Sequence, residues 1–325
     1  MATAAPSRVE SSRSAGGDGG RRKAEKRKKI SDLKKLGRRD KIVVGLFLGV
    51  PLVLVLVLVV FPAIATVILS FGKWNGIGGL DQIEWIGTEN YRNAVTIYPP
   101  FWPAIQNNVV MLVFLFTVPT VLGIYLAVLL DRQLRGGWFY ETSFFMPVVL
   151  SLALTGFIWQ LIYSRDQGLI NALTGGTTDW YGDPSVNFYA VLVAQGWRHT
   201  GYIMLIYLAG LKGVDVALRE AALMDGCTER QTFFKIIFPV MKPINIIVLV
   251  ITVIESLRAF DIVWVINKGR NGLELIAALV TQNVSGEASR IGFASALATI
   301  MLLISTIFVI IYLRVVMRDE PGGAR

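Results

Sequence analysis

The sequence predicts an all-α, polytopic membrane protein with six transmembrane helices. Apolar residues make up 54% of the chain and charged residues only 17%, whereas soluble domains carry about 25% charged residues. Six stretches are apolar over the roughly 20 residues that a helix needs to cross a bilayer. These stretches are continuously apolar and do not alternate between apolar and polar residues, so a β-barrel is not expected.

The first 41 residues form a basic segment that differs in composition from the rest of the chain. They hold 14 Lys+Arg and 5 Asp+Glu, which accounts for the whole formal net charge of +9. This segment, rich in Gly, Ser and Ala, cannot bury a core and predicts a disordered tail. A nucleic-acid-binding arm is one interpretation. Because the basic cluster directly precedes an apolar segment, attraction to anionic membrane lipids is favoured, and no nucleic-acid partner is expected.

The transmembrane domain is expected to occupy residues 42–318, with a short C-terminal tail over residues 319–325. The predicted spans are roughly Ile42–Leu69, Val109–Leu130, Phe144–Tyr163, Phe188–Leu211, Ile244–Ile266 and Phe293–Leu313. The first span is long and contains Pro51 and Pro62, so it is expected to be tilted, kinked or extended past the bilayer.

The distribution of basic residues predicts the orientation of these spans. With the N-terminus inside, the cytoplasmic stretches hold 24 Lys+Arg, and the stretches on the opposite side hold 6. Cytoplasmic loops carry the excess of Lys and Arg, so both termini are expected in the cytoplasm of a prokaryotic cell whose membrane holds the chain as a multi-pass protein.

The loop Val216–Pro243 has the pattern of two short helices joined at a hinge. Val216–Asp225 is rich in helix-forming residues, and Gly226 stands where a glycine ends a helix. Thr228 and Gln231 then form a capping-box pattern that starts a second helix. This second helix is expected to end before Pro239, because the residue before a proline avoids the helical region. The loop either packs on its own bundle or docks a soluble partner.

At these residues the sequence resembles the EAA loop of binding-protein-dependent ABC importer permeases, in particular the carbohydrate branch. The resemblance rests on Glu220-Ala221-Ala222, then Gly226, then Ile236 and Phe238-Pro239, and Asp225-Gly226 resembles the carbohydrate branch. The family usually has Leu where Phe238 stands. The resemblance continues outside the loop at Phe61-Pro62, Trp85-Ile86-Gly87, Asn90-Tyr91, Trp197-Arg198, Phe260-Asp261 and Gly292-Phe293-Ala294.

The resemblance implies the type I ABC importer permease fold and a permease subunit that carries a sugar or oligosaccharide by alternating access. It also implies four kinds of partner: a second permease, two ATP-binding cassette subunits, an extracytoplasmic solute-binding protein and the sugar itself. The residues that it assigns to ATPase coupling are Glu220, Ala221, Ala222, Asp225 and Gly226.

The chain is not expected to be an enzyme. It contains no G-x-x-x-x-G-K-[ST] phosphate loop, so Mg-ATP would bind to the partner ATPases and no cofactor is expected in this chain. His199 and Cys227 are each the only residue of their type. A catalytic Cys/His pair and a histidine-based metal site are therefore not expected.

Polar residues within the predicted spans are candidates for substrate contact, because charges inside a bilayer require a partner or an aqueous cavity. Glu255, Arg258 and Asp261 are spaced i, i+3 and i+6 in the fifth span, where they either neutralise one another or contact substrate. Arg198 and His199 in the fourth span could also pair with a carboxylate of the fifth span. An ion-coupled transporter or channel that uses Glu255, Arg258 and Asp261 is the alternative function.

Sugar recognition requires hydroxyl groups and an aromatic face near the middle of the membrane. Tyr202 in the fourth span, with Thr252 and Ser256 in the fifth, supplies this chemistry, and Thr252 and Ser256 share one helical face. The predicted substrate-binding residues are thus Tyr202, Thr252, Ser256, Glu255 and Asp261. The alternative for Thr252 and Ser256 is a hydrogen bond to a carbonyl of their own helix.

Overall fold

The computed structural model describes residues 37–132, 134–286 and 289–318. The predicted C-terminal tail, and the predicted N-terminal tail as far as residue 36, lie outside the described residues. The all-α prediction is confirmed: in the described part of the chain the only strands are β1 (Gly72–Lys73) and β2 (Glu84–Trp85), which pair antiparallel with Gly72 opposite Trp85. The chain divides into two units, one ending at Ile64 and one beginning at Ala65.

The described part of the first unit is one long apolar helix. It comprises α2 (Arg38–Val55), a π-helical turn η1 (Leu56–Val60) and the first residues of α3 (Phe61–Leu69). The helix continues through Pro51, and in the π turn the N–H of Phe61 donates to the carbonyl of Leu56, five residues earlier. Arg39–Leu69 is 31 residues long, or about 47 Å at ~1.5 Å per residue, which exceeds the ~30 Å hydrocarbon core.

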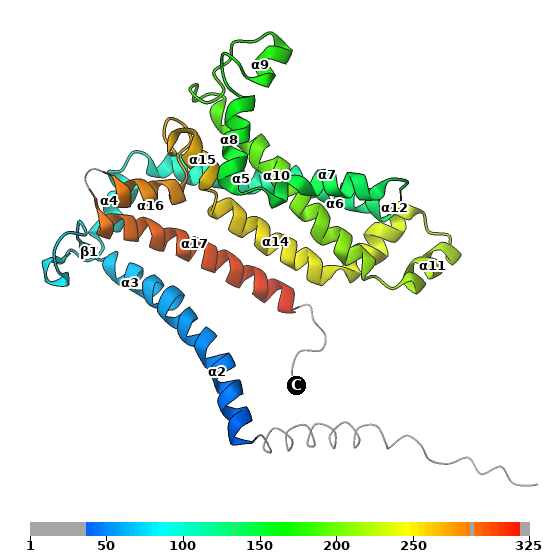
Figure 1. The fold of residues 1–325 in the computed structure, drawn as a ribbon, viewed down its shortest axis with the longest axis horizontal. Helices are drawn as coiled ribbons and strands as arrows, with labels where there is room; N and C mark the ends of the chain where they lie inside the picture. Colours follow the sequence, from blue (N-terminus) through cyan, green and yellow to red (C-terminus); the bar gives the residue numbers. More distant parts are fainter. Residues whose placement is uncertain (1–36, 133, 287–288, 319–325) are drawn as a thin grey trace, which may run out of the picture. The chain divides into compact units, whose positions relative to one another are not determined.

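The second unit contains the remaining helices (Figure 1). The 3₁₀ turn η2 (Leu80–Gln82) lies between the two strands in the chain, and α4 (Glu89–Thr96) follows β2. The others, in chain order, are α5 (Phe101–Thr117), α6 (Pro119–Asp131), α7 (Gly137–Val149), α8 (Leu152–Ile162), α9 (Leu169–Thr174), α10 (Asn187–Lys212), α11 (Val216–Met224), α12 (Glu229–Thr232), the π turn η3 (Phe233–Ile237), α13 (Phe238–Val240), α14 (Lys242–Leu257), α15 (Asp261–Asn267), α16 (Ile276–Ser285) and α17 (Ile291–Arg318).

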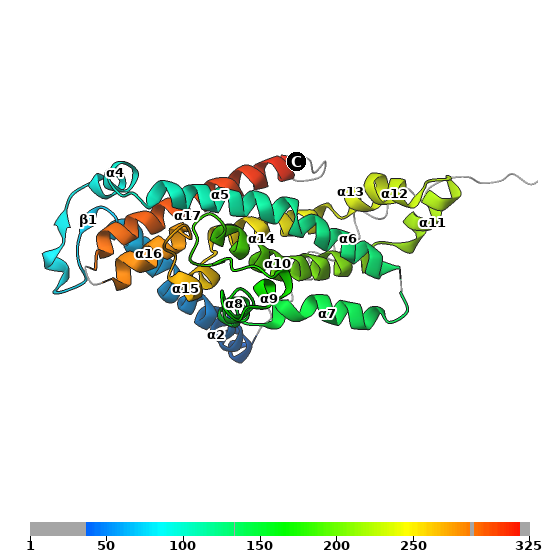
Figure 2. The ribbon, with the colours of Figure 1, turned by 90° about the horizontal axis from the view of Figure 1, so that it is seen from above.

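Helix α10 is the centre of this unit and packs against α5, α6, α7 and α14 (Figures 1 and 2). Small residues allow the close approach that membrane helices favour. A Cβ atom at Gly123 of α6 would lie 2.8 Å from Ile203 of α10, and one at Gly201 would collide with the carbonyl oxygen of Phe144 in α7. Larger residues at either glycine would push α10 away from its neighbours.

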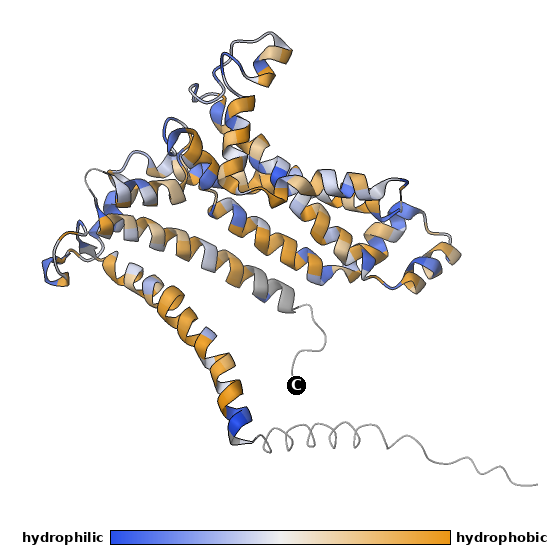
Figure 3. Ribbon diagram, in the orientation of Figure 1, coloured by the Kyte–Doolittle hydropathy of each residue, from blue (hydrophilic) through white to orange (hydrophobic). Residues whose placement is uncertain are grey.

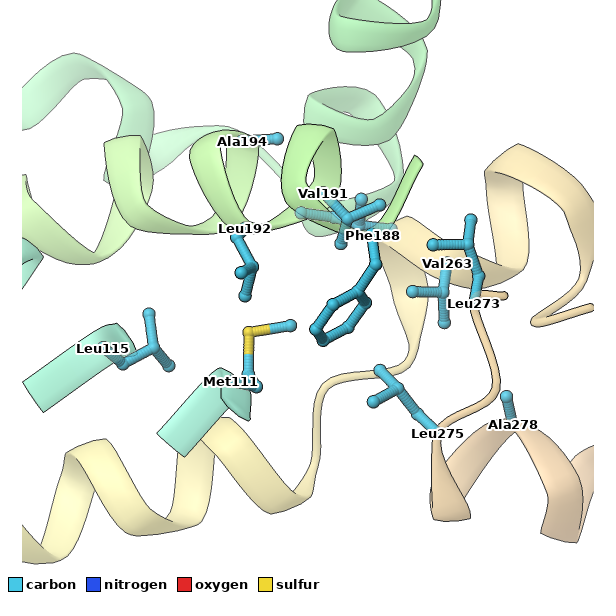
Figure 4. Close-up of a cluster of buried hydrophobic side chains, with 11 residues drawn as sticks. Met111, Leu115, Phe188, Val191, Leu192, Ala194, Val263, Leu273, Leu275 and Ala278 are labelled. Carbon is cyan, nitrogen blue, oxygen red and sulfur yellow. The ribbon is translucent and has the colours of Figure 1, made fainter. Parts of the chain in front are cut away.

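Two buried clusters connect α10 to the elements around the site. In the first, Met111 of α5 and Phe188 of α10 pack with Leu275 at the start of α16 (Figure 4). In the second, Tyr207 of α10 packs with Ile237 of η3 and other buried residues of α6 and α14. The second cluster therefore joins the loop between α10 and α14 to the transmembrane core.

Among the residues that the structure describes, three helices are each long and apolar enough to cross a membrane. They are Arg39–Leu69, Phe101–Asp131 and Ile291–Ile311, which contain most of the first, second and sixth predicted spans (Figure 3). Three further helix pairs qualify only if each bent pair is one span. The exact number of six spans therefore stays a prediction.

The third predicted span, Phe144–Tyr163, is wrong as a continuous helix, because α7 and α8 meet at 103°. Leu150 has extended backbone geometry, and the Ser151 hydroxyl accepts a hydrogen bond from Leu154 N–H and starts α8. The fifth predicted span, Ile244–Ile266, is also interrupted, since α14 ends at Leu257 and α15 begins at Asp261.

Candidate functional site

Helix α11 has the ends that its sequence predicts. The Asp215 carboxylate accepts a hydrogen bond from Ala217 N–H at 3.0 Å and caps the N-terminus. At the C-terminus Gly226 has a φ of +73°. Gly226 N–H donates to the Leu223 carbonyl and Cys227 N–H to the Ala222 carbonyl, both at 3.0 Å. These two bonds form the Schellman motif, which requires a left-handed residue and therefore favours glycine.

The second arm begins as predicted and ends later than predicted. Thr228 and Gln231 form the capping box: Gln231 N–H donates to the Thr228 hydroxyl oxygen, and Thr228 N–H donates to the Gln231 side chain. The expected end before Pro239 is wrong, because η3 and α13 carry the helix on to Val240. Pro239 lies in the first turn of α13, where the missing N–H is tolerated, and the preceding π turn changes the local hydrogen-bond spacing. The whole segment Val216–Val240, which comprises α11, the turn at Gly226 and the arm Glu229–Val240, is called the elbow below.

Most of the predicted coupling residues lie on the surface of the elbow. Glu220, Ala221, Asp225 and Gly226 are exposed, whereas Ala222 is buried. Beside them Leu223 and Met224 are 64% and 88% exposed. An exposed apolar surface bordered by polar residues is typical of a protein interaction site.

Two ion pairs attach the elbow to the end of α6, and sequence reasoning missed both. Arg219 of α11 binds Asp131 at 2.5 Å and donates a second hydrogen bond to the Leu211 carbonyl of α10 at 3.0 Å. Arg132 binds Glu229 of the second arm at 2.6 Å. The adjacent opposite charges Asp131-Arg132 at the end of an apolar stretch are the signal in the sequence that could have indicated these contacts. Both arms of the elbow are thus held by neighbouring residues of one helix end.

A small polar pocket lies where α14 gives way to α15. Its cavity of about 70 Å³ is lined by Gln195 of α10 together with Glu255, Arg258 and Asp261. Of the two roles predicted for Glu255, Arg258 and Asp261, mutual neutralisation is wrong. The helix breaks between them, and among the described residues Arg258 and Asp261 form no ion pair. Glu255 binds Arg198 of α10 instead, at 3.4 Å, which confirms the expected pairing of Arg198 with a carboxylate of the fifth predicted span.

The other predicted substrate ligands do not line this pocket. Thr252 and Ser256 are fully buried, and each hydroxyl donates to a carbonyl of its own helix, at Val248 and Val253 respectively, both at 2.8 Å. Nε2 of His199 lies 3.2 Å from the Thr252 hydroxyl oxygen. Tyr202 is half-buried on α10. Of the five predicted ligands, the structure therefore brings only Glu255 and Asp261 together in one pocket.

Interlocking hydrogen bonds organise the loops at the other end of α10. The Asn187 side chain donates to the Asn271 carbonyl at 2.6 Å, and the Asn271 side chain donates to the Gly182 carbonyl at 2.8 Å. Hydrogen bonds from Ser185 lower the pKa of the Asp183 carboxyl, and burial raises the pKa of the Tyr181 hydroxyl. These contacts connect the loop before α10 to the loop after α15.

Comparisons with known proteins agree with this architecture. The chain is 31% identical to the xylose/arabinose import permease protein of Haloferax volcanii, over 79% of this chain and 82% of that protein. It is 28% identical to a trehalose/maltose transport system permease protein of Thermococcus litoralis, over 81% of this chain and 90% of that protein.

A solved structure has a similar fold. It is a crystal structure of a bacterial ABC transporter involved in the import of the acidic polysaccharide alginate. The TM-score is 0.75 at 18% identity, and the match covers 90% of this chain and 99% of that chain.

Residues 110–318, more than half of the chain, match the family described as the binding-protein-dependent transport system inner membrane component. This match includes both arms of the elbow, the polar pocket and the helices that connect them. The chain therefore belongs to the family of inner membrane components of binding-protein-dependent transport systems.

Proposed function

We propose that this chain is a permease subunit of an ATP-driven importer of sugars or oligosaccharides. The observation that carries the proposal is the elbow: an exposed helical hinge with apolar residues at its tip, attached by two ion pairs to the transmembrane helices. Its relatives, which include a xylose/arabinose import permease protein and a trehalose/maltose transport system permease protein, support the substrate class.

The proposed assembly contains a second permease, two ATP-binding cassette subunits and an extracytoplasmic solute-binding protein. Helix α11 inserts into a cleft of one ATPase, and Mg-ATP binds only to the ATPases. The elbow and both termini face the cytoplasm. The excess of basic residues on this side, which includes Arg219, Arg230 and Lys235 in the elbow, supports that orientation.

Coupling would follow the contacts that leave α11. Closure of the ATPases displaces α11, and Arg219 passes this displacement to α6 through Asp131 and to α10 through the Leu211 carbonyl. Helix α10 also carries Arg198, the partner of Glu255 at the polar pocket. A movement of α10 therefore changes the charge environment at the α14–α15 break, where the alternating-access pathway is proposed to open.

Glu255 and Asp261 are the proposed polar contacts of the sugar, with Tyr202, Thr252 and Ser256 as further candidates. Carboxylates accept hydrogen bonds from sugar hydroxyls, and both carboxylates lie at the pocket. Thr252 and Ser256 become available only if α14 moves, because both hydroxyls are buried in this conformation.

Transport by the complete complex in reconstituted vesicles tests the function. We expect sugar uptake that requires ATP and the solute-binding protein. Glu220→Lys reverses a charge on the exposed face of α11, and Gly226→Asp places a side chain at a left-handed position, so both are expected to weaken ATPase docking or uncouple hydrolysis from uptake.

Two outcomes would contradict the proposal. Uptake without ATP that follows an ion gradient would indicate a secondary transporter or channel using Glu255, Arg258 and Asp261. The second outcome has two parts: the Gly226→Asp variant fails to form the complex, and the intact wild-type complex shows no uptake under any condition. This outcome would indicate an assembly subunit whose loop only recruits a partner.

A further inference from the structure

A groove of about 720 Å³ runs between α6 and the elbow. It is lined by residues of α6 and by the aromatic side chains of η3 and α13, and Leu223 of α11 also lines it. Residues that define the groove are Val121, Tyr125, Val128, Phe233, Phe234 and Phe238. Val121, Tyr125 and Phe234 are each 58–59% exposed, so the groove is an open apolar surface.

The groove reaches from the charged end of α6 well into its apolar part. Val121 and Asp131 both line it and are ten residues apart on α6. This separation corresponds to about 15 Å along the helix axis, or roughly half of the ~30 Å hydrocarbon core. A soluble protein does not reach this depth, whereas the acyl chain of a bilayer lipid does.

The charged residues stand only at the shallow end. Two of the three arginines there are neutralised, since Arg219 pairs with Asp131 and Arg132 pairs with Glu229. Arg230 lies over the Phe234 ring at 6.0 Å and forms no ion pair with any residue that the structure describes. The rim of the groove therefore has one uncompensated positive charge directly beside an aromatic wall.

We infer that this groove binds an anionic phospholipid of the cytoplasmic leaflet. The acyl chain lies along Val121, Tyr125 and Phe234, and the headgroup phosphate meets the guanidinium of Arg230. Arginine matches a phosphate with paired N–H donors. The arm Glu229–Val240, which is bent by 77° from the following helix, has aromatic residues toward the groove and basic residues nearby, as in helices that lie at a membrane interface. The placement in the cytoplasmic leaflet rests on the orientation in the proposed function.

Lipid retention by the purified transporter complex tests this inference. In nanodiscs that contain phosphatidylglycerol and phosphatidylcholine, native mass spectrometry is expected to find phosphatidylglycerol bound preferentially. Arg230→Gln should lower the phosphatidylglycerol affinity about fivefold, equivalent to about 1 kcal/mol for one basic residue at an anionic surface. Lys235→Gln is the matched control, because Lys235 is an exposed cation of the same arm that does not line the groove.

A second pair of variants tests the apolar wall. Val121→Trp fills the groove and should displace the lipid whatever its headgroup, whereas Leu122→Trp places the same side chain on an exposed position of α6 outside the groove and should not. Equal retention of phosphatidylcholine and phosphatidylglycerol by the wild-type complex, or equal effects within either matched pair, would overturn the inference.

Cross-linking identifies the occupant directly. A photoreactive phenylalanine analogue in place of Phe234, activated in native membranes, should add the mass of one phospholipid to the chain. A cross-link to the second permease or to an ATPase would overturn the lipid assignment. Neither measurement requires sugar uptake, so failure of the lipid inference and failure of the proposed transport function are distinguishable.

Discussion

Arg219 joins the elbow to both α6 and α10. Its pair with Asp131 is partly enclosed, with side chains 30% and 15% exposed, and the same guanidinium also binds the Leu211 carbonyl. Arg219→Gln leaves Asp131 without its cation, so we expect a loss of about 1–3 kcal/mol in stability and less sugar transported per ATP. Thermal unfolding of the solubilised complex and the transport-to-hydrolysis ratio measure the two effects.

The second ion pair supplies the control for this prediction. Arg132 and Glu229 are 53% and 73% exposed, and exposed pairs contribute only about 0–1 kcal/mol. Arg132→Gln should therefore change stability and coupling less than Arg219→Gln. Equal effects of the two variants would show that neither the partial burial of the Arg219–Asp131 pair nor the additional Leu211 contact contributes to stability or coupling.

Asp183 gives a pH-dependent prediction in the loop before α10. Its carboxylate accepts hydrogen bonds from the backbone and the hydroxyl of Ser185 at 2.8 and 2.7 Å, and these lower its pKa from 3.8. Because the folded pKa is depressed, the stabilisation is fully present above the unfolded pKa and is lost as pH falls through the folded value.

Hydrogen exchange at the Ser185 amide measures this effect after correction for the intrinsic exchange rate. We expect protection to fall as pH drops below 3.8. Asp183→Asn has no carboxylate to titrate, so its corrected profile should lack this step. If the loss of protection at low pH persists in Asp183→Asn, another titrating group causes it.

The buried hydroxyl groups show what sequence reasoning cannot decide at the residue scale. Thr252 and Ser256 lie four residues apart on one helical face. This spacing is equally compatible with substrate contact and with hydrogen bonds to carbonyls of their own helix, so the sequence does not decide between the two roles. The structure shows hydrogen bonds to Val248 and Val253 and complete burial. Arg198, by contrast, was expected to find a carboxylate because a charge at membrane depth requires one, and it binds Glu255.

The elbow was predictable at the scale of elements because its signals are local. The Gly226 stop and the Thr228 capping box depend on residues within a few positions of one another, and both are confirmed. The end before Pro239 was predicted from proline alone and is wrong, since the π turn η3 carries the helix through. The interruptions within the third and fifth predicted spans were also missed. Leu150 lies in a continuously apolar stretch, and the charges around Arg258 were interpreted as polar residues within one continuous span.

Gly226 makes the hinge of the elbow sensitive to substitution. Its φ of +73° is a left-handed conformation, so Gly226→Ala is expected to cost about 1 kcal/mol. Gly136 has a φ of +75°, and a Cβ atom would meet nothing within 4 Å at either position. The two alanine variants should therefore lose similar thermal stability, while only Gly226→Ala reduces ATPase coupling. If Gly136→Ala reduces coupling as much as Gly226→Ala does, the defect results from general destabilisation and not from the hinge.

At the scale of the whole molecule, composition was sufficient to predict an all-α membrane protein. The apolar helices and the family match confirm that class. Helix lengths alone give neither the number of membrane spans nor the side of the membrane on which each loop lies, because both are defined relative to the membrane. The basic-residue count supplies a prediction of the side, with 24 residues against 6.

The single cysteine of the chain tests that orientation, because Cys227 is a partly exposed free thiol in the elbow. A membrane-impermeant maleimide should label Cys227 in inside-out vesicles stripped of peripheral subunits and should not label it in sealed right-side-out vesicles. Ile77 is 71% exposed in the first loop, which is predicted to lie on the other side of the membrane, so Ile77→Cys in a Cys227→Ser background should show the reverse pattern. Rebinding the ATPases should slow the labelling of Cys227 and leave the labelling of the Ile77→Cys variant unchanged. Labelling of Cys227 from outside would place the elbow beyond the reach of any cytoplasmic ATPase and would reject the coupling mechanism together with the orientation.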